Sequence, residues 1–117
     1  MDRSGTRLTP LTSEEKLVNV AIEKSGTKLV DSLVAKLLAG YPVRSVQTTE
    51  TPLMNGAVWV KMEIALPVRV TPNEAGWFAA SLAQYVKGKG ARFRGFDMFE
   101  LRGTTRMIEI YFETPRA

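Results

Sequence analysis

The sequence predicts an α+β fold in which an antiparallel sheet of about four strands carries helices on one face. Residues 57–70 alternate apolar and polar side chains, as a strand with one buried face does. Residues 28–39 repeat apolar side chains at helical spacing, and a glycine-containing turn at 102–105 joins two β-prone segments. With 117 residues, 44% of them hydrophobic and 24% charged, we expect one folded domain.

The start of the chain allows two interpretations. Residues 1–11 mix charges with Gly, Ser and Pro, so we expect a flexible arm before a single domain at 12–117. A capping sequence at 12–15 favours a helix through residue 24, which gives the order α-α-β-β-α-β-β. Residues 17–22, LVNVAI, would also suit a strand. In that case the order is βαββαββ, close to a ferredoxin-like sandwich with an added strand.

The next helix is predicted from Thr27, a capping residue, to about Ala39. Its apolar stripe consists of Leu29, Val30, Leu33, Val34, Leu37 and Leu38. Gly40 and Pro42 end it.

Two strands should follow. Residues 43–51 are β-prone but polar, which is typical of an edge strand. In residues 57–70 the even positions are apolar, so we expect them to face the core and the odd positions to face outward. Pro67 lacks an amide donor, and the strand should bend or leave the sheet there.

The last elements are a helix and a hairpin. Thr71, Pro72 and Glu74 form a helix start, and Gly88 and Gly90 a helix end. Its inner face is expected to contain Phe78, Leu82, Tyr85 and Val86. Trp77 is a candidate for exposure, although a tryptophan more usually lies at the edge of a core. Residues 91–113 are expected to form a hairpin, with a bulge at Gly95 that resets its alternation.

Composition excludes several classes of chemistry. The chain has no cysteine and no histidine, which excludes thiol nucleophiles, disulfides, zinc fingers and histidine catalysis. No nucleotide-binding or nucleophile-elbow motif is present. We therefore expect no enzyme, no cofactor and no catalytic or metal-binding residue. The remaining enzymatic alternative is a metal-dependent nuclease built on strand carboxylates, for which the candidates are Glu63, Asp97, Glu109 and Glu113.

The expected location is the cytoplasm. The first ten residues have no apolar run of the kind that a secretory signal needs. The longest uncharged stretch, residues 75–86, is shorter than the roughly 17–25 residues of a membrane-spanning helix. The absence of cysteine also suits a reducing compartment.

The net charge of +4 is concentrated in one segment. Lys87, Lys89, Arg92 and Arg94 lie there without an acid, while the other twelve bases balance the twelve acids. Glycines and two aromatic residues, Phe93 and Phe96, separate these cations. Cations neutralise phosphates, glycines allow close approach of the backbone, and aromatic rings stack on bases. The segment predicts a non-enzymatic, sequence-tolerant nucleic-acid-binding protein, for DNA or RNA.

The outward positions of the sheet suggest an alternative function. Trp59, Lys61, Met107 and Tyr111 should point away from the helices and need a partner. The partner would be nucleic-acid bases or a second copy of the chain. Acids in the same phase favour the second copy, so the alternative is a structural or inhibitory protein–protein interaction module that forms homo-oligomers.

Overall fold

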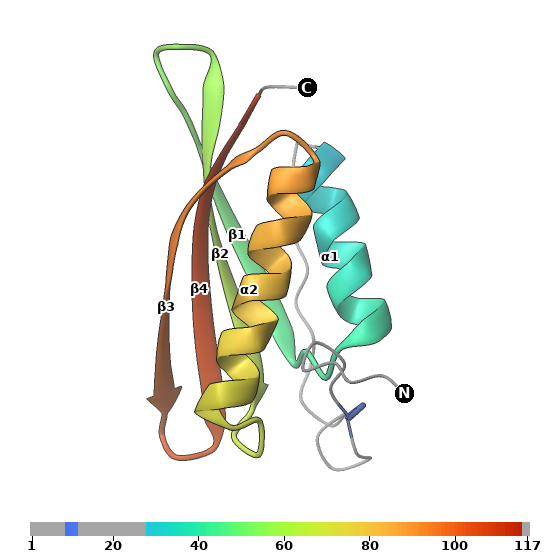
Figure 1. Cartoon of the computed structure of the whole chain (residues 1–117). Helices are drawn as coiled ribbons and strands as arrows, with labels where there is room; N and C mark the ends of the chain where they lie inside the picture. Colours follow the sequence, from blue (N-terminus) through green and yellow to red (C-terminus); the bar gives the residue numbers. More distant parts are fainter. Residues whose placement is uncertain (1–8, 12–27, 116–117) are drawn as a thin grey trace.

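The fold consists of one antiparallel sheet covered on one side by a helical layer. The computed structural model describes residues 9–11 and 28–115, and Figure 1 shows α1 and α2 on the same side of the sheet. The elements are α1 (Lys28–Gly40), β1 (Ser45–Pro52), β2 (Ala57–Pro67), α2 (Pro72–Gly88), β3 (Arg92–Leu101) and β4 (Thr105–Pro115). The sheet order is β1-β2-β4-β3. The predicted α+β class is confirmed.

The first helix, α1, buries Val30, Leu33, Val34 and Leu37 against the sheet and α2. It ends at Gly40, where the amide of Tyr41 still donates to the carbonyl of Leu37 at 3.1 Å. The helix predicted at 12–24, and its strand alternative at 17–22, lie outside the described residues. Both inner strands, β2 and β4, have neighbours on each side, so a further strand would have to join at the outer edge of β1 or β3.

The strand prediction for 57–70 holds for most of its length. Val58, Val60, Met62 and Ile64 are buried under the helices, and the odd positions between them face outward and are half-buried. The strand ends at Pro67, three residues before the predicted boundary, because proline has no amide to continue the ladder. β1 is an edge strand, as predicted.

The second helix, α2, begins with the predicted cap. The amide of Glu74 donates to Thr71 Oγ1 at 3.2 Å, and the Thr71 amide donates to Glu74 Oε1 at 2.9 Å. Of the two alternatives for Trp77, the structure has the exposed one, with 54% of its surface accessible. The helix turns Phe78 and Leu82 inward instead, and Trp77 points off that face.

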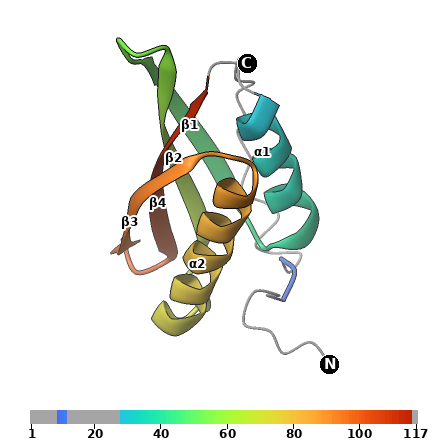
Figure 2. The same ribbon diagram turned by 45° about the horizontal axis from the view of Figure 1, so that its top comes forward.

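The hairpin of β3 and β4 contains the predicted bulge. Phe93 pairs with Phe112, but Gly95, with φ of +144°, pairs with Tyr111, so the alternation of β3 shifts by one residue at Arg94. Figure 2 shows β3 at the margin of the sheet beside β4. The bulge places Phe96 and Met98 on the helix side and Asp97 and Phe99 on the other.

Polar contacts fix the connections at one end of the sheet. Arg106 Nε donates to the carbonyl of Val70 at 2.9 Å, just before α2 begins. Arg69 donates to the carbonyls of Thr9 and Pro10 at 3.2 and 2.8 Å. No helix within the described ranges has the length and apolar character needed to cross a membrane.

Candidate functional site

The candidate site is the face of the sheet turned away from the helices, called here the open face. Antiparallel register places its side chains in rows that run across the strands. The tryptophan row contains Thr51, Trp59, Glu113 and Arg92. The basic row contains Thr49, Lys61, Tyr111 and Gly95, with Arg94 of the bulge beside it. The acidic row contains Gln47, Glu63, Glu109 and Asp97, and the methionine row Ser45, Ala65, Met107 and Phe99.

The tryptophan and basic rows bring aromatic and charged groups together. The rings of Trp59 and Tyr111 lie 6.1 Å apart between centroids, at an angle of 33°. Arg94 Nε lies 3.7 Å from Glu113 Oε2, so this cation belongs to the open face. The structure therefore groups Trp59, Lys61 and Tyr111, which the sequence assigned to an interface, on one surface.

The acidic row places three carboxylates on adjacent strands. Glu63 pairs directly with Glu109, and Glu109 with Asp97. Like charges in such positions repel. The Lys61 ammonium lies 3.8 Å from Glu63 Oε2, and the Tyr111 hydroxyl donates to Glu109 Oε1 at 2.6 Å.

The hydrogen bond to Glu109 changes the chemistry of Tyr111. Together with partial burial and the negative charges of Glu109 and Asp97, it raises the pKa of Tyr111 to about 12. The phenol therefore stays neutral and acts as a donor. Within the described residues, no group of three or more carboxylates has an arrangement that could hold a metal ion.

The methionine row makes one end of the open face apolar. Met107 is half-buried, Phe99 is 42% exposed, and the neighbouring Leu101 is 46% exposed. The sequence analysis did not assign Phe99 or Leu101 a role. The bulge at Gly95 could have indicated their position, because it turns both side chains to the same face of the sheet as Met107.

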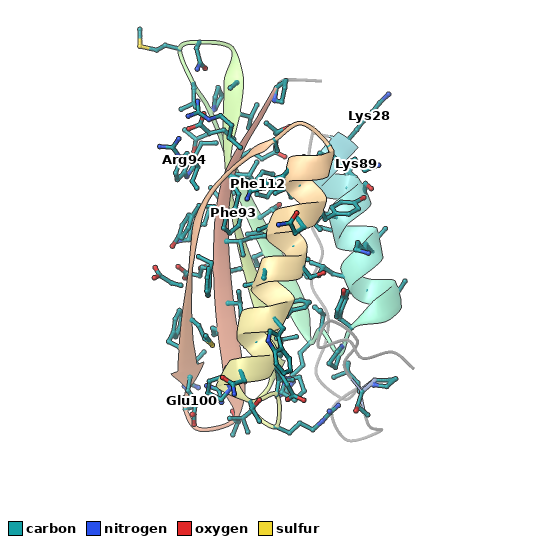
Figure 3. The ribbon with its side chains drawn as sticks, in the orientation of Figure 1. Lys28, Lys89, Phe93, Arg94, Glu100 and Phe112 are labelled. Carbon is teal, nitrogen blue, oxygen red and sulfur yellow. The ribbon has the colours of Figure 1, made fainter. Side chains whose placement is uncertain are left out.

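The basic segment does not form one surface. Lys89 Nζ lies 5.6 Å from the centre of the Tyr85 ring, on the helical layer, whereas Arg94 lies beside Glu113 on the open face. Figure 3 shows these two labelled residues on opposite sides of the fold. Lys87 and Arg92 are exposed near each end of the connection. Adjacency in sequence therefore does not bring the four cations onto one surface, because the chain crosses from helix to sheet between them.

The aromatic residues of the basic segment also separate. Phe93 packs against the core, and Phe96 lies on the helix side of β3 with 42% of its surface exposed. Lys36, which the sequence analysis had not selected, joins Lys89 at Tyr85, with Nζ 5.3 Å from the ring centre. The hydroxyl groups of Tyr85 and Ser32 share a hydrogen bond of 2.6 Å. This ring is therefore occupied by contacts within the chain.

Comparison with known proteins adds no functional information. No protein-family model, curated protein or solved structure matches the chain. The residues of the open face are therefore the basis of the function proposed below.

Proposed function

We propose that this chain is a non-enzymatic protein–protein interaction module that forms homo-oligomers through its open face. One observation carries the proposal: the face left uncovered by the helices brings Trp59, Tyr111, Met107 and Phe99 onto a common surface. Large apolar side chains that reach solvent together on one face of a folded domain mark an interaction site. We also place the protein in the cytoplasm, a part of the proposal supported by its lack of cysteine.

The composition of the open face supports a protein partner. Aromatic residues, methionine and arginine are enriched in protein interfaces, and tryptophan, tyrosine and arginine commonly dominate their energetics. All of these occur on the open face. By contrast, the exposed Trp77 and Met54 lie apart from it, on α2 and in the β1–β2 turn.

Sedimentation analysis over a range of concentrations tests the proposal. We expect reversible self-association, and Trp59→Ser and Phe99→Ser should each weaken it by about tenfold or more. The matched control is Trp77→Ser, which removes a similarly exposed aromatic residue from the helical layer and should leave the association unchanged. Circular dichroism checks that each variant is folded. A wild-type chain that stays monomeric at all concentrations would contradict the proposal, as would equal effects of Trp59→Ser and Trp77→Ser.

Nucleic-acid binding is a second candidate, favoured by the net charge of +4 and by the proximity of Lys36 and Lys89 to one ring. If Lys87, Lys89, Arg92 and Arg94 contact phosphates from their two sides of the fold, log affinity for a random oligonucleotide should fall against log salt by roughly 0.9 for each phosphate that they neutralise. Replacing these four residues with serine should abolish the binding. Affinity that is independent of salt would remove this candidate.

A further inference from the structure

The order of the rows on the open face defines how a second copy would fit. This inference rests on the proposed self-association and adds its register. We infer that two copies pack open face to open face, with antiparallel strands and with the basic row of each copy over the acidic row of the other.

The geometry follows from the rules of sheet packing. Packed sheets lie about 10 Å apart, with their strands within about 30° of each other in the aligned class. A two-fold axis that lies between the sheets and runs across the strands places each strand over its own copy, in the opposite direction. The position of this axis along the strands decides which rows meet.

An axis at the level of Met62, between the basic and acidic rows, gives matching charges. Lys61 then faces the partner's Glu63, and Arg94 faces the partner's Asp97. Each contact occurs twice because of the two-fold symmetry. The Tyr111 phenol, which donates a hydrogen bond to Glu109 of its own chain, also faces the partner's Glu109.

The same axis also matches side-chain size. The tryptophan row falls over the methionine row, so Trp59 faces the partner's Ala65. A large side chain thereby meets a small one, as interdigitating sheet faces require. Arg92 lies over the partner's Phe99, where a guanidinium can stack on the ring.

Other two-fold registers fit worse. An axis through the acidic row places Glu63, Glu109 and Asp97 over their own copies, and an axis parallel to the strands also places acid over acid. An axis between the acidic and methionine rows places the methionine row of one copy over the carboxylates of the other. The carboxylates would then lose their hydration without gaining a cation, which is unfavourable. The register at Met62 is the arrangement that brings both Lys61 and Arg94 onto the acidic row.

This pairing also reduces an electrostatic repulsion that is present within each single chain. Glu63 and Glu109 repel each other as direct cross-strand neighbours. The partner's Lys61 and Arg94 bring positive charge over that row. Paired charges in an interface chiefly set register and partner choice, so Lys61 and Glu63 are the residues expected to determine specificity.

Complementary charge reversal tests the register directly. Lys61→Glu places a carboxylate opposite the partner's Glu63, and Glu63→Lys places an ammonium opposite the partner's Lys61. Each variant alone should self-associate at least about tenfold more weakly than the wild type. An equimolar mixture should recover affinity within about threefold of the wild type, because each chain then faces the opposite charge. The control is Lys36→Glu, a reversal on the helical layer that should change neither association nor mixing.

A distance measurement gives an independent test of strand direction. The chain has no cysteine, so Met54→Cys provides a single labelling site at the fully exposed β1–β2 turn. Met54 precedes Met62 by eight residues, so the antiparallel register predicts about 50 Å between spin labels on the two copies, at about 3.3 Å per residue. A parallel arrangement would bring the two turns within about 20 Å.

The outcomes separate the two proposals. If the wild type is monomeric, the proposed function itself fails. If the wild type associates and loses association in Trp59→Ser, but the two charge variants show no recovery on mixing or the labels lie near 20 Å, only the register is wrong. Association that is indifferent to every open-face substitution would instead indicate pairing through the edge of β1 or β3, and would overturn both.

Discussion

The two faces of the sheet are built from the same strands, yet they differ in how their chemistry is organised. On the covered face, Val60, Met62, Ile64, Ile108, Ile110 and Phe112 are all fully buried. Each inner strand, β2 or β4, predicts this face by itself, since every second residue in its middle is apolar. On the open face, single strands alternate between apolar and charged positions, and order emerges only across strands. Alternation therefore identifies the core, whereas register identifies the proposed interaction surface.

Adjacent residues of β2 should show the largest contrast in stability. Met62→Ala removes a fully buried side chain and should cost about 2–5 kcal/mol through lost burial and a cavity. Lys61→Ala changes the neighbouring residue on the open face and should alter stability by about 0.5 kcal/mol or less. Urea unfolding of dilute, monomeric protein measures both. Similar losses for the two variants would show that the open face contributes to the core of the monomer.

The bulge that sets the phase of β3 should tolerate no side chain. Gly95 has φ of +144°, which L-residues rarely adopt, so Gly95→Ala should destabilise the monomer by about 1–3 kcal/mol. The control is Gly76→Ala within α2, where nothing lies within 4 Å of the added carbon and φ is not positive. That substitution should stabilise by about 0.5–1 kcal/mol, because alanine favours the helix. Effects of the same sign would contradict this assignment of the bulge.

The smallest expected effect concerns Tyr111. Because its pKa of about 12 exceeds the ordinary value of 10.0, its contribution to stability is complete below pH 10 and is lost as pH rises towards 12. Glu109→Gln removes the charged acceptor and should shift the phenol titration, followed by ultraviolet absorbance, to lower pH. Tyr111→Phe identifies the transition by eliminating it. An unchanged titration in Glu109→Gln would place the cause elsewhere.

Local patterns predicted most of the fold. The cap at Thr71, the break at Pro67, the edge position of β1 and the bulge at Gly95 each depend on neighbouring residues, and each was confirmed. For Trp77 the sequence left two alternatives, because helical spacing does not define the exact margin of a core. The helix or strand at residues 12–24 stays a prediction.

The candidate site was predicted only in part. Trp59, Lys61, Met107 and Tyr111 share the open face as expected, because strand alternation alone assigns them to it. Phe99 also lies on this face, because the bulge at Gly95 shifts the alternation of β3 by one residue. Alternation within β3 alone does not show this shift. The cations were grouped by proximity in sequence, yet Lys89 and Arg94 end on opposite sides because a helix-to-sheet crossing separates them.

The bulge at Arg94 and Gly95 also bears on whether other chains can pair with the β3 edge of the sheet. β3 is an outer strand, and an uninterrupted outer strand would offer a template on which further chains could add without limit. The bulge interrupts the regular hydrogen-bonding edge of β3 between Phe93 and Gly95. A bulge also bends the strand and increases its local twist, which makes flat pairing with another chain less favourable. An interrupted rim disfavours open-ended edge pairing, which leaves the open face as the surface for the closed assembly proposed above.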